Sequence, residues 1–313
     1  MPKRTAVVVG AGVNGLSCAL RLLERDWAVH IVARERTPDT TSDIAAAVAL
    51  PYLAEPAPRV LGWYRLSLRA FDSLSEKPPS GVQWIDMVDL QVDERAIPPP
   101  WSAVVRDFEV TAGPPHLPEY RVAWRAQVPL VPMDRYMPYL ERRCRELGAS
   151  FEQATLQHLD EVDHPHVVHC AGLGARALAR DNGVYPIRGQ LVRVENHGMK
   201  KFWCDDAGPR GLSYLIPRGD EVIIGGTAQA HDDRLEPDPS AEDAMLGRAL
   251  EIVPILRRAE VLGRAVGLRP ARFEVRVERE RRGRCTIVHN YGHGGAGVSL
   301  SWGCADEVVE LLD

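Results

Sequence analysis

The sequence predicts an α/β protein in which a Rossmann-like nucleotide-binding domain is interleaved with a second domain built on a large mixed or antiparallel sheet. The first observation is length, because 313 residues suggest about two domains of roughly 150 residues each. The second is that strand–glycine–helix passages occur at the start, in the middle and at the end of the chain. The third is that the segments between these passages alternate like antiparallel strands.

Three separated passages imply interleaving rather than one linear cut. We expect the nucleotide-binding domain to comprise residues 1–53, 131–183 and 267–313. The second domain is then formed by the two insertions, residues 54–130 and 184–266.

The opening passage, residues 5–35, predicts a strand, a helix and a second strand. Residues 6–9 are an apolar run short enough for a buried parallel strand. Apolar residues then recur at helical spacing through residues 16–23, and residues 29–33 resume strand character. This is the order of a βαβ unit.

The rest of the chain divides between helices and strands. Apolar spacing predicts helices within residues 59–76, 133–148 and 240–259. We expect Ser240 to open the last of these, with Asp243 in the capping-box position. Strand patterns lie within residues 81–94, 101–113, 187–195, 212–217 and 221–226, and strand–glycine–helix passages within 166–179 and 285–312.

Composition excludes several classes of function. A net charge of −5 without a dominant basic face argues against nucleic-acid binding. The six cysteines form no C-x-x-C pair, so we expect neither a metal site nor a redox dithiol. No apolar run approaches the ~18 residues of a membrane span, and residue 5 already begins a strand rather than a signal peptide. These features predict a cytoplasmic protein.

Gly10, Gly12 and Gly15 form a G-x-G-x-x-G motif between the first strand and helix. The glycines permit a tight turn, close backbone approach to a pyrophosphate and close helix–strand packing. The helix N-terminus adds free N–H groups and the positive end of its dipole. The motif predicts a dinucleotide site but does not distinguish NAD from FAD.

An acidic residue that binds ribose is expected about 20 residues after the motif. Glu35 has this separation from Gly15, but Ala33 occupies the usual position at the end of the strand, followed by Arg34. Arg34 and Glu35 either share ribose or phosphate contacts or are two exposed charges. The sequence leaves both interpretations open.

Four further segments carry a resemblance to a known family: "TPDTTSDIAAAVALPYL" (37–53), "GLSYLIP", "VGLRPAR" and "HNYGHGGAG". Together they resemble the FAD-dependent D-amino-acid oxidase family, which includes the D-aspartate oxidases. The similarity covers nearly the whole chain. It implies an FAD domain interleaved with a substrate domain. It also implies oxidation of a D-amino acid to an imino acid, hydrolysis to a 2-oxo acid and ammonia, and reduction of dioxygen to hydrogen peroxide.

The resemblance assigns substrate contacts to three residues. Arg269 matches the carboxylate-binding arginine, and a planar two-pronged cation suits that task. Tyr214 matches a tyrosine whose hydroxyl also contacts the carboxylate, and the carbonyl of Gly295 matches the acceptor for the substrate amine. The alternatives are a structural salt bridge for Arg269 and a core position for Tyr214. We also expect Tyr52, Leu50 and Ile216 to line the pocket.

Two departures from the family bear on specificity and access. Ala228 stands where D-aspartate oxidases have an arginine for a second carboxylate, so neutral, apolar D-amino acids are the expected substrates. The "RGLSY" segment (210–214) is shorter than in vertebrate members and lacks their extra tyrosine, which predicts a short lid. No strong general base is needed, and His289 and His293 are expected to pack or to hydrogen-bond the loop.

The resemblance implies a larger set of residues around FAD. The glycine-rich stretch at 292–297 is expected to meet the flavin ring and the substrate, with a helix dipole that stabilises charge on the reduced ring. Arg276 resembles a flavin-contacting arginine. The expected cofactor residues are Gly10, Ala11, Gly12, Val13, Asn14, Gly15, Arg34, Glu35, Thr40, Thr41, Ser42, Ala46, Ala47, Val48, Leu156, Ala171, Gly172, Arg276, Gly292, Gly294, Gly295, Ala296, Gly297, Val298 and Ser299.

Rival functions remain at this stage. One is a related flavin oxidase acting on glycine, sarcosine or D-aspartate, another an NAD-dependent dehydrogenase, and a third a non-catalytic nucleotide-binding protein. The expected partners are a small D-amino acid and dioxygen, with a possible homodimer and no nucleic acid, membrane or metal.

Overall fold

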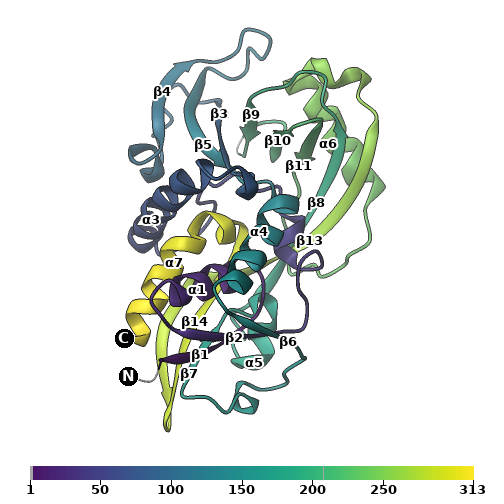
Figure 1. Ribbon diagram of the computed structural model, residues 1–313. Coiled ribbons are helices and arrows are strands. Elements are labelled where there is room, and N and C mark those ends of the chain that lie inside the picture. The colour runs from purple at the N-terminus through teal and green to yellow at the C-terminus, as the bar shows by residue number, and fades with distance from the viewer. Residues whose placement is uncertain (1–2, 207) are drawn as a thin grey trace. The chain divides into compact units, whose positions relative to one another are not determined.

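The computed structural model describes residues 3–206 and 208–313. The chain forms two compact units, and Figure 1 shows their elements coloured along the sequence. Unit 1 comprises residues 1–82, 133–186 and 269–313, and unit 2 comprises residues 83–132 and 187–268.

Unit 1 contains a parallel sheet in the order β14 (Cys285–His293), β7 (His166–His169), β1 (Thr5–Val9), β2 (Ala28–Ala33) and β6 (Ser150–Gln153). The second half of β13 (Val261–Arg282) runs antiparallel to β14. The strands come from the start, middle and end of the chain. The predicted interleaving and the opening βαβ unit are therefore confirmed.

Helices of unit 1 pack together around α1 (Val13–Leu23), which contacts α4 (Met133–Glu146) and α7 (Gly297–Leu312). The first and last parts of the chain, purple and yellow, lie side by side in this unit (Figure 1). Their ends are joined by an ion pair of 2.5 Å between Arg4 and Asp313.

Helix α3 (Ala57–Ser75) also belongs to unit 1. It packs on α7, where a Cβ at Gly303 would overlap the backbone of Trp63 and where the Gly303 amide donates to Ser67 Oγ at 3.0 Å. The expected division at residue 53 is therefore corrected to residue 82. The apolar face of α3 indicated burial but not which domain would cover it.

Unit 2 contains a largely antiparallel sheet in the order β4, β5, β3, β9, β10, β11 and β8, followed by the first half of β13. The exception is the parallel pair β3–β9. The bounds are β3 (Gln83–Gln91), β4 (Arg106–Ala112), β5 (Val122–Leu130), β8 (Tyr185–Glu195), β9 (Phe202–Asp205), β10 (Ser213–Arg218), β11 (Glu221–Gly225) and β12 (Gln229–Ala230), which pairs with β8. The expected large mixed sheet is confirmed.

One face of this sheet packs on α6 (Pro239–Ile252). The core there joins alternate strand residues, such as Val88, Leu90 and Leu215, to Met245 and Ile252 of the helix. Because side chains alternate along a strand, residues 89 and 214 lie on the other face.

The N-cap of α6 is Asp238, whose carboxylate accepts from the amides of Ser240 at 2.9 Å and Ala241 at 3.4 Å. The expected cap at Ser240 was wrong. Pro239 provides the physical reason, since proline fits the first helical position and moves the cap one residue before itself.

Short helical turns complete the two units: α2 (Thr41–Ile44), α5 (Ala175–Leu178), η1 (Pro78–Ser80), η2 (Pro100–Ala103), η3 (Leu159–Glu161), η4 (Gly172–Gly174), η5 (Pro254–Arg258) and η6 (Gly294–Ala296).

Candidate active site

The first glycine loop lies between β1 and α1 of unit 1. Gly10 has a φ of 108°, and a Cβ there would overlap the carbonyl of Cys170 on the neighbouring chain segment. A Cβ at Gly15 would overlap the Gly10 carbonyl. The tight turn and the close packing both exclude side chains, as the motif predicted.

Polar groups that could bind a ligand lie where this loop meets the N-terminus of α1. Val13 N donates to Ser42 Oγ at 3.0 Å, which brings the hydroxyl-rich 40–42 segment to the start of α1. Asn14 Oδ1 is buried and has no hydrogen-bond partner among the described residues. A buried polar atom without a partner is costly, and the adjoining helix N-terminus favours anions. These residues fit the phosphates of a dinucleotide.

The second glycine-rich loop adjoins the first. It forms the turn η6 between β14 and α7, with φ values of 82° at Gly292 and 55° at Gly294. A Cβ at Gly297 would lie 3.4 Å from Asn14 Nδ2. The helix begins at Gly297, directly after this turn. The two loops, far apart in sequence, therefore meet at the N-termini of α1 and α7.

Other expected cofactor residues gather in unit 1. Thr40 caps α2 together with Asp43, and Ala47 adopts a φ of 53° just beyond that turn. Leu156 and Ala171 pack against the apolar cluster of β1, β2 and β7. Gly172, with a φ of 56°, lies against Pro270, the residue after Arg269.

Arg34 and Glu35 pair with each other at the surface. Arg34 Nε donates to Glu35 Oε1 at 2.9 Å, and both side chains are exposed. This geometry agrees with the interpretation as two exposed charges and leaves a ribose contact as an expectation.

Three of the expected substrate residues converge in unit 1. A Cβ placed on Gly295 would lie 3.3 Å from Tyr52 Cδ1 and 3.8 Å from Arg269 Cδ. Leu50 is held close by, because its carbonyl accepts from Ser299 Oγ of α7 at 2.7 Å. An arginine, a tyrosine ring and a glycine backbone therefore share one small region beside the second glycine loop.

Unit 2 carries the other two expected residues, Tyr214 and Ile216, on the same face of β10. Tyr214 lies opposite Gly225 of β11, where a Cβ would overlap the ring and its hydroxyl. The ring therefore extends over β11, which only glycine at position 225 permits.

Sequence reasoning missed the residues that support Tyr214. Arg248 of α6 donates from Nε to Ser213 Oγ at 3.0 Å and from Nη2 to the Gly226 carbonyl at 3.3 Å. A Cβ at Gly226 would overlap the Leu212 carbonyl. The available sequence signal was the Gly225–Gly226 pair.

Arg276 makes several contacts within unit 1. Its Nη1 donates to the Tyr291 hydroxyl and its Nε to Glu278, each at 2.5 Å. Tyr291 in turn donates to Asp181 at 2.9 Å. The arginine is thus positioned by a polar network on β13 and β14.

The histidines near the loop are buried and neutral. His289 Nε2 lies 2.9 Å from Glu280, and its Nδ1 lies 3.1 Å from Nδ1 of His169. Burial lowers the pKa of His169 to about 3 and that of His293 to about 4. Neutral, buried rings agree with packing and hydrogen-bonding roles.

The described residues contain no group of three or more metal-binding side chains. All six cysteines are free in residues 3–206 and 208–313, including Cys18 and Cys170, whose sulfurs are 3.9 Å apart. Over the same residues, no helix has the length and apolarity needed to cross a membrane.

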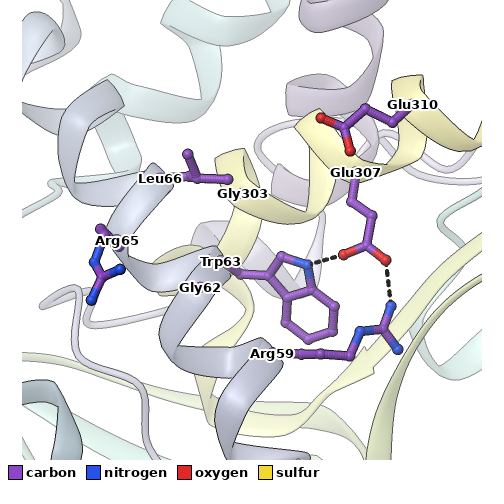
Figure 2. A pocket seen from close by; sticks show the side chains of 8 residues that line it. All are labelled: Arg59, Gly62, Trp63, Arg65, Leu66, Gly303, Glu307 and Glu310. Carbon is purple, nitrogen blue, oxygen red and sulfur yellow. Dashed lines mark hydrogen bonds and ion pairs between the residues drawn. The ribbon is translucent and has the colours of Figure 1, made fainter.

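A hollow of about 370 Å³ between α3 and α7 contains none of the expected site residues. Figure 2 shows that Glu307 accepts from both Trp63 and Arg59 at its edge, at 2.6 and 2.5 Å. These groups join the two helices.

Comparisons with known proteins agree with this architecture. Among curated relatives, a D-amino-acid oxidase from Rubrobacter xylanophilus is 43% identical, covering 98% of this chain and 95% of its own. One from Streptomyces coelicolor is 38% identical over 97% and 95%. A human D-aspartate oxidase is 34% identical over 97% and 93%.

Among solved structures, glycine oxidase from Bacillus cereus has a TM-score of 0.82 at 20% identity, covering 99% of this chain and 95% of its own. This similarity supports the fold. A family model described as DAO, FAD dependent oxidoreductase, matches residues 5–311. The chain therefore belongs to the FAD dependent oxidoreductase family.

Proposed function

We propose that this protein is a D-amino-acid oxidase, which converts neutral D-amino acids, water and dioxygen into 2-oxo acids, ammonia and hydrogen peroxide. The observation that carries the proposal is the convergence of Arg269, Tyr52 and Gly295 beside two adjoining glycine loops. Relatives named D-amino-acid oxidase that align over nearly the whole chain support the choice of substrate class.

Each proposed substrate contact follows from residue chemistry. The guanidinium of Arg269 binds the carboxylate in two-pronged fashion, with the Tyr214 hydroxyl as a second donor. The Gly295 carbonyl accepts an N–H of the substrate amine. With the carboxylate and the amine fixed in this way and the side chain held by Leu50, Tyr52 and Ile216, the hydrogen on Cα of only one enantiomer would be directed at the cofactor.

FAD, when bound, would supply the acceptor for a hydride from Cα and would pass the two electrons to dioxygen. The protein's own residues align the substrate, whose amine is neutral when the hydride leaves Cα. Burial lowers the pKa of His169 to about 3 and that of His293 to about 4, which makes both rings weak bases, so neither is assigned the removal of a proton from Cα. Water then hydrolyses the imino acid after it forms.

The second glycine loop has a proposed electrostatic role. The N-terminus of α7 at Gly297 lies beside Asn14 of the first loop. The N–H groups of its first turn, and a dipole equivalent to roughly half a positive charge, would stabilise negative charge on a flavin ring bound there. Small residues at 294–297 leave room for cofactor and substrate together.

Side-chain preference follows from Leu50, Tyr52, Ile216 and Ala228. None of them carries the positive charge that a second substrate carboxylate would require. Neutral, mainly apolar side chains are therefore the proposed class. The alternative is a related flavin amine oxidase acting on glycine, sarcosine or D-aspartate. The human relative is named D-aspartate oxidase, which supports the last of these.

We further propose that unit 1 is the FAD-binding domain and unit 2 the substrate-binding domain, in a cytoplasmic protein that can form a homodimer. We propose that the short 210–214 segment leaves substrate entry and product release less gated than a longer lid would. It is anchored by Arg210, which pairs with Glu119 and, at 2.6 Å, with Glu251.

A panel of D- and L-amino acids, glycine and sarcosine tests this function, with peroxide production as the readout. The FAD-loaded protein should be yellow, should turn over D-alanine and D-valine, and should leave their L-enantiomers unreacted. Preferred oxidation of glycine or sarcosine would favour the alternative. A colourless protein that does not respond to added FAD would contradict the proposal.

A further inference from the structure

Asp89, Cys204 and Tyr214 form a row across three neighbouring strands of unit 2. Asp89 of β3 lies opposite Cys204 of β9, and Cys204 lies opposite Tyr214 of β10. Residues directly opposite each other in a sheet project from the same face. The row therefore shares its face with the tyrosine proposed to bind the substrate carboxylate.

This face is distinct from the one that α6 covers. Val88 and Leu90 flank Asp89 in sequence, Leu215 follows Tyr214, and all three belong to the core formed with α6. Alternation along each strand then directs Asp89 and Tyr214 away from that core.

The Tyr214 ring points away from β9 and β3, the strands that carry Cys204 and Asp89. The ring extends over Gly225 of β11, the strand on the side of β10 away from β9. On this face of the row, β9 contributes Cys204 and β3 contributes Asp89. Strands lie about 4.8 Å apart, so the Cα atoms of Asp89 and Tyr214 are about 10 Å apart along the row.

The Asp89 carboxyl is short of strong donors. It is 8% exposed, and it accepts from Gln91 Nε2 at 2.9 Å and from the Cys204 thiol. Burial, followed by the charge of Asp206, raises its pKa to about 7. A ligand group that donates a hydrogen bond would stabilise this carboxyl, whereas a second carboxylate would be repelled.

We propose that Asp89 is a specificity-determining residue of the substrate site, which disfavours D-amino acids with acidic side chains and favours those whose side chains end in an amide or ammonium group. The inference rests on the proposed function, because that function places the substrate carboxylate at Tyr214. It extends the proposed substrate class from neutral, mainly apolar side chains to polar side chains that donate hydrogen bonds.

D-glutamate and D-glutamine make a matched test, because they differ in charge and in the N–H donor but scarcely in shape. The measurement is kcat/KM for both on the FAD-loaded wild type, Asp89→Asn and Asp86→Asn, with D-alanine as reference. Asp86 is on the same strand but exposed. Its side chain lies on the opposite face from Asp89.

In Asp89→Asn, the ratio of kcat/KM for D-glutamate to that for D-glutamine should rise about tenfold or more, because a like-charge contact is removed. In Asp86→Asn the ratio should equal that of the wild type. An unchanged ratio in Asp89→Asn would overturn the inference.

The wild type alone also tests it. If it oxidises D-glutamate as efficiently as D-glutamine, Asp89 does not select against acidic side chains, even if the variant does not fold. Absence of D-alanine oxidation by the yellow wild-type protein would instead contradict the proposed function itself.

Discussion

At the scale of single residues, Gly295 lies between two side chains of the proposed substrate site. A methyl group there would approach Tyr52 Cδ1 to 3.3 Å and Arg269 Cδ to 3.8 Å. The first distance is tighter than ordinary van der Waals contact, so the tyrosine ring or the loop must move. The proposed carbonyl contact to the substrate amine would move with the loop.

Gly295→Ala is therefore expected to lower kcat for D-alanine by roughly tenfold or more, since small misplacements of reacting groups are costly. The readouts are steady-state kinetics and flavin absorbance. Gly62→Ala is the matched control, because no atom lies within 4 Å of its added Cβ and it lies in α3. Equal kinetics in the two variants would contradict the placement of Gly295.

Individual roles differ in how far the sequence could predict them. The motif alone predicts the tight turn at Gly10. The φ of 108° found there is one that favours glycine over other residues. The support of Tyr214 by Arg248 could not be predicted, since it joins α6 to two strand ends that are remote in sequence. The spacing of Arg34 and Glu35 from the glycine motif did not decide whether they contact the cofactor or pair with each other at the surface.

At the scale of elements, α6 fixes the ends of the two strands that carry Tyr214 and Gly225. Arg248 reaches Ser213 at the start of β10 and the Gly226 carbonyl just after β11. Ser213 is buried and donates to the Gly211 carbonyl at 3.1 Å. One guanidinium thus sets where the β10 strand begins.

Arg248→Ala is expected to raise KM for D-alanine and the inhibition constant of a competing simple carboxylate together, by roughly tenfold, since hydrogen bonds to charged groups contribute about 1.5–3 kcal/mol. Flavin absorbance should be unchanged, because Arg248 contacts Ser213 and Gly226, which both belong to unit 2. Arg248→Lys should recover part of the loss and Arg258→Ala, an exposed arginine, should show none. A lower kcat with KM and inhibitor affinity unaltered would contradict a positioning role.

Helices and strands with strong periodicity were predicted well, but the elements against which they pack were predicted less well. The opening βαβ unit and the hairpin of β10 and β11 appear where alternation and turn residues indicated. Helix α3 was also expected, but its partner α7 lies more than 200 residues away along the sequence. Packing across such a separation depends on shape, here Gly303 against Trp63, which local periodicity does not contain.

At the scale of the whole molecule, buried ionisable groups determine how stability changes with pH. His169 and His293 have pKa values lowered by burial to about 3 and 4, so the unfolded chain gains protons on them first as pH falls below about 6.5. Their contribution to stability is present above that pH and is lost during acidification. Asp89 acts in the opposite direction.

Burial and the charge of Asp206 raise the pKa of Asp89 from 3.8 to about 7, and Asp205 adds to the effect while Cys204 and Gln91 oppose it. Between these values the folded state holds a proton that the unfolded chain has released. Stability from this group is therefore fully present below pH 3.8 and is lost as pH rises through about 7, with a slope of at most about 1.4 kcal/mol per pH unit.

Asp89→Asn removes this dependence, because the amide does not titrate. The free energy of unfolding of Asp89→Asn minus that of the wild type should increase steadily from pH 4 to pH 7 and then level off. Urea unfolding at fixed FAD concentration measures it, with Asp86→Asn as the exposed control on the same strand. A difference that stays constant over this range would mean that Asp89 has an ordinary pKa in the folded protein. The selectivity assigned to Asp89 would then have to rest on its charge at every working pH rather than on a carboxyl that gains its charge near neutrality.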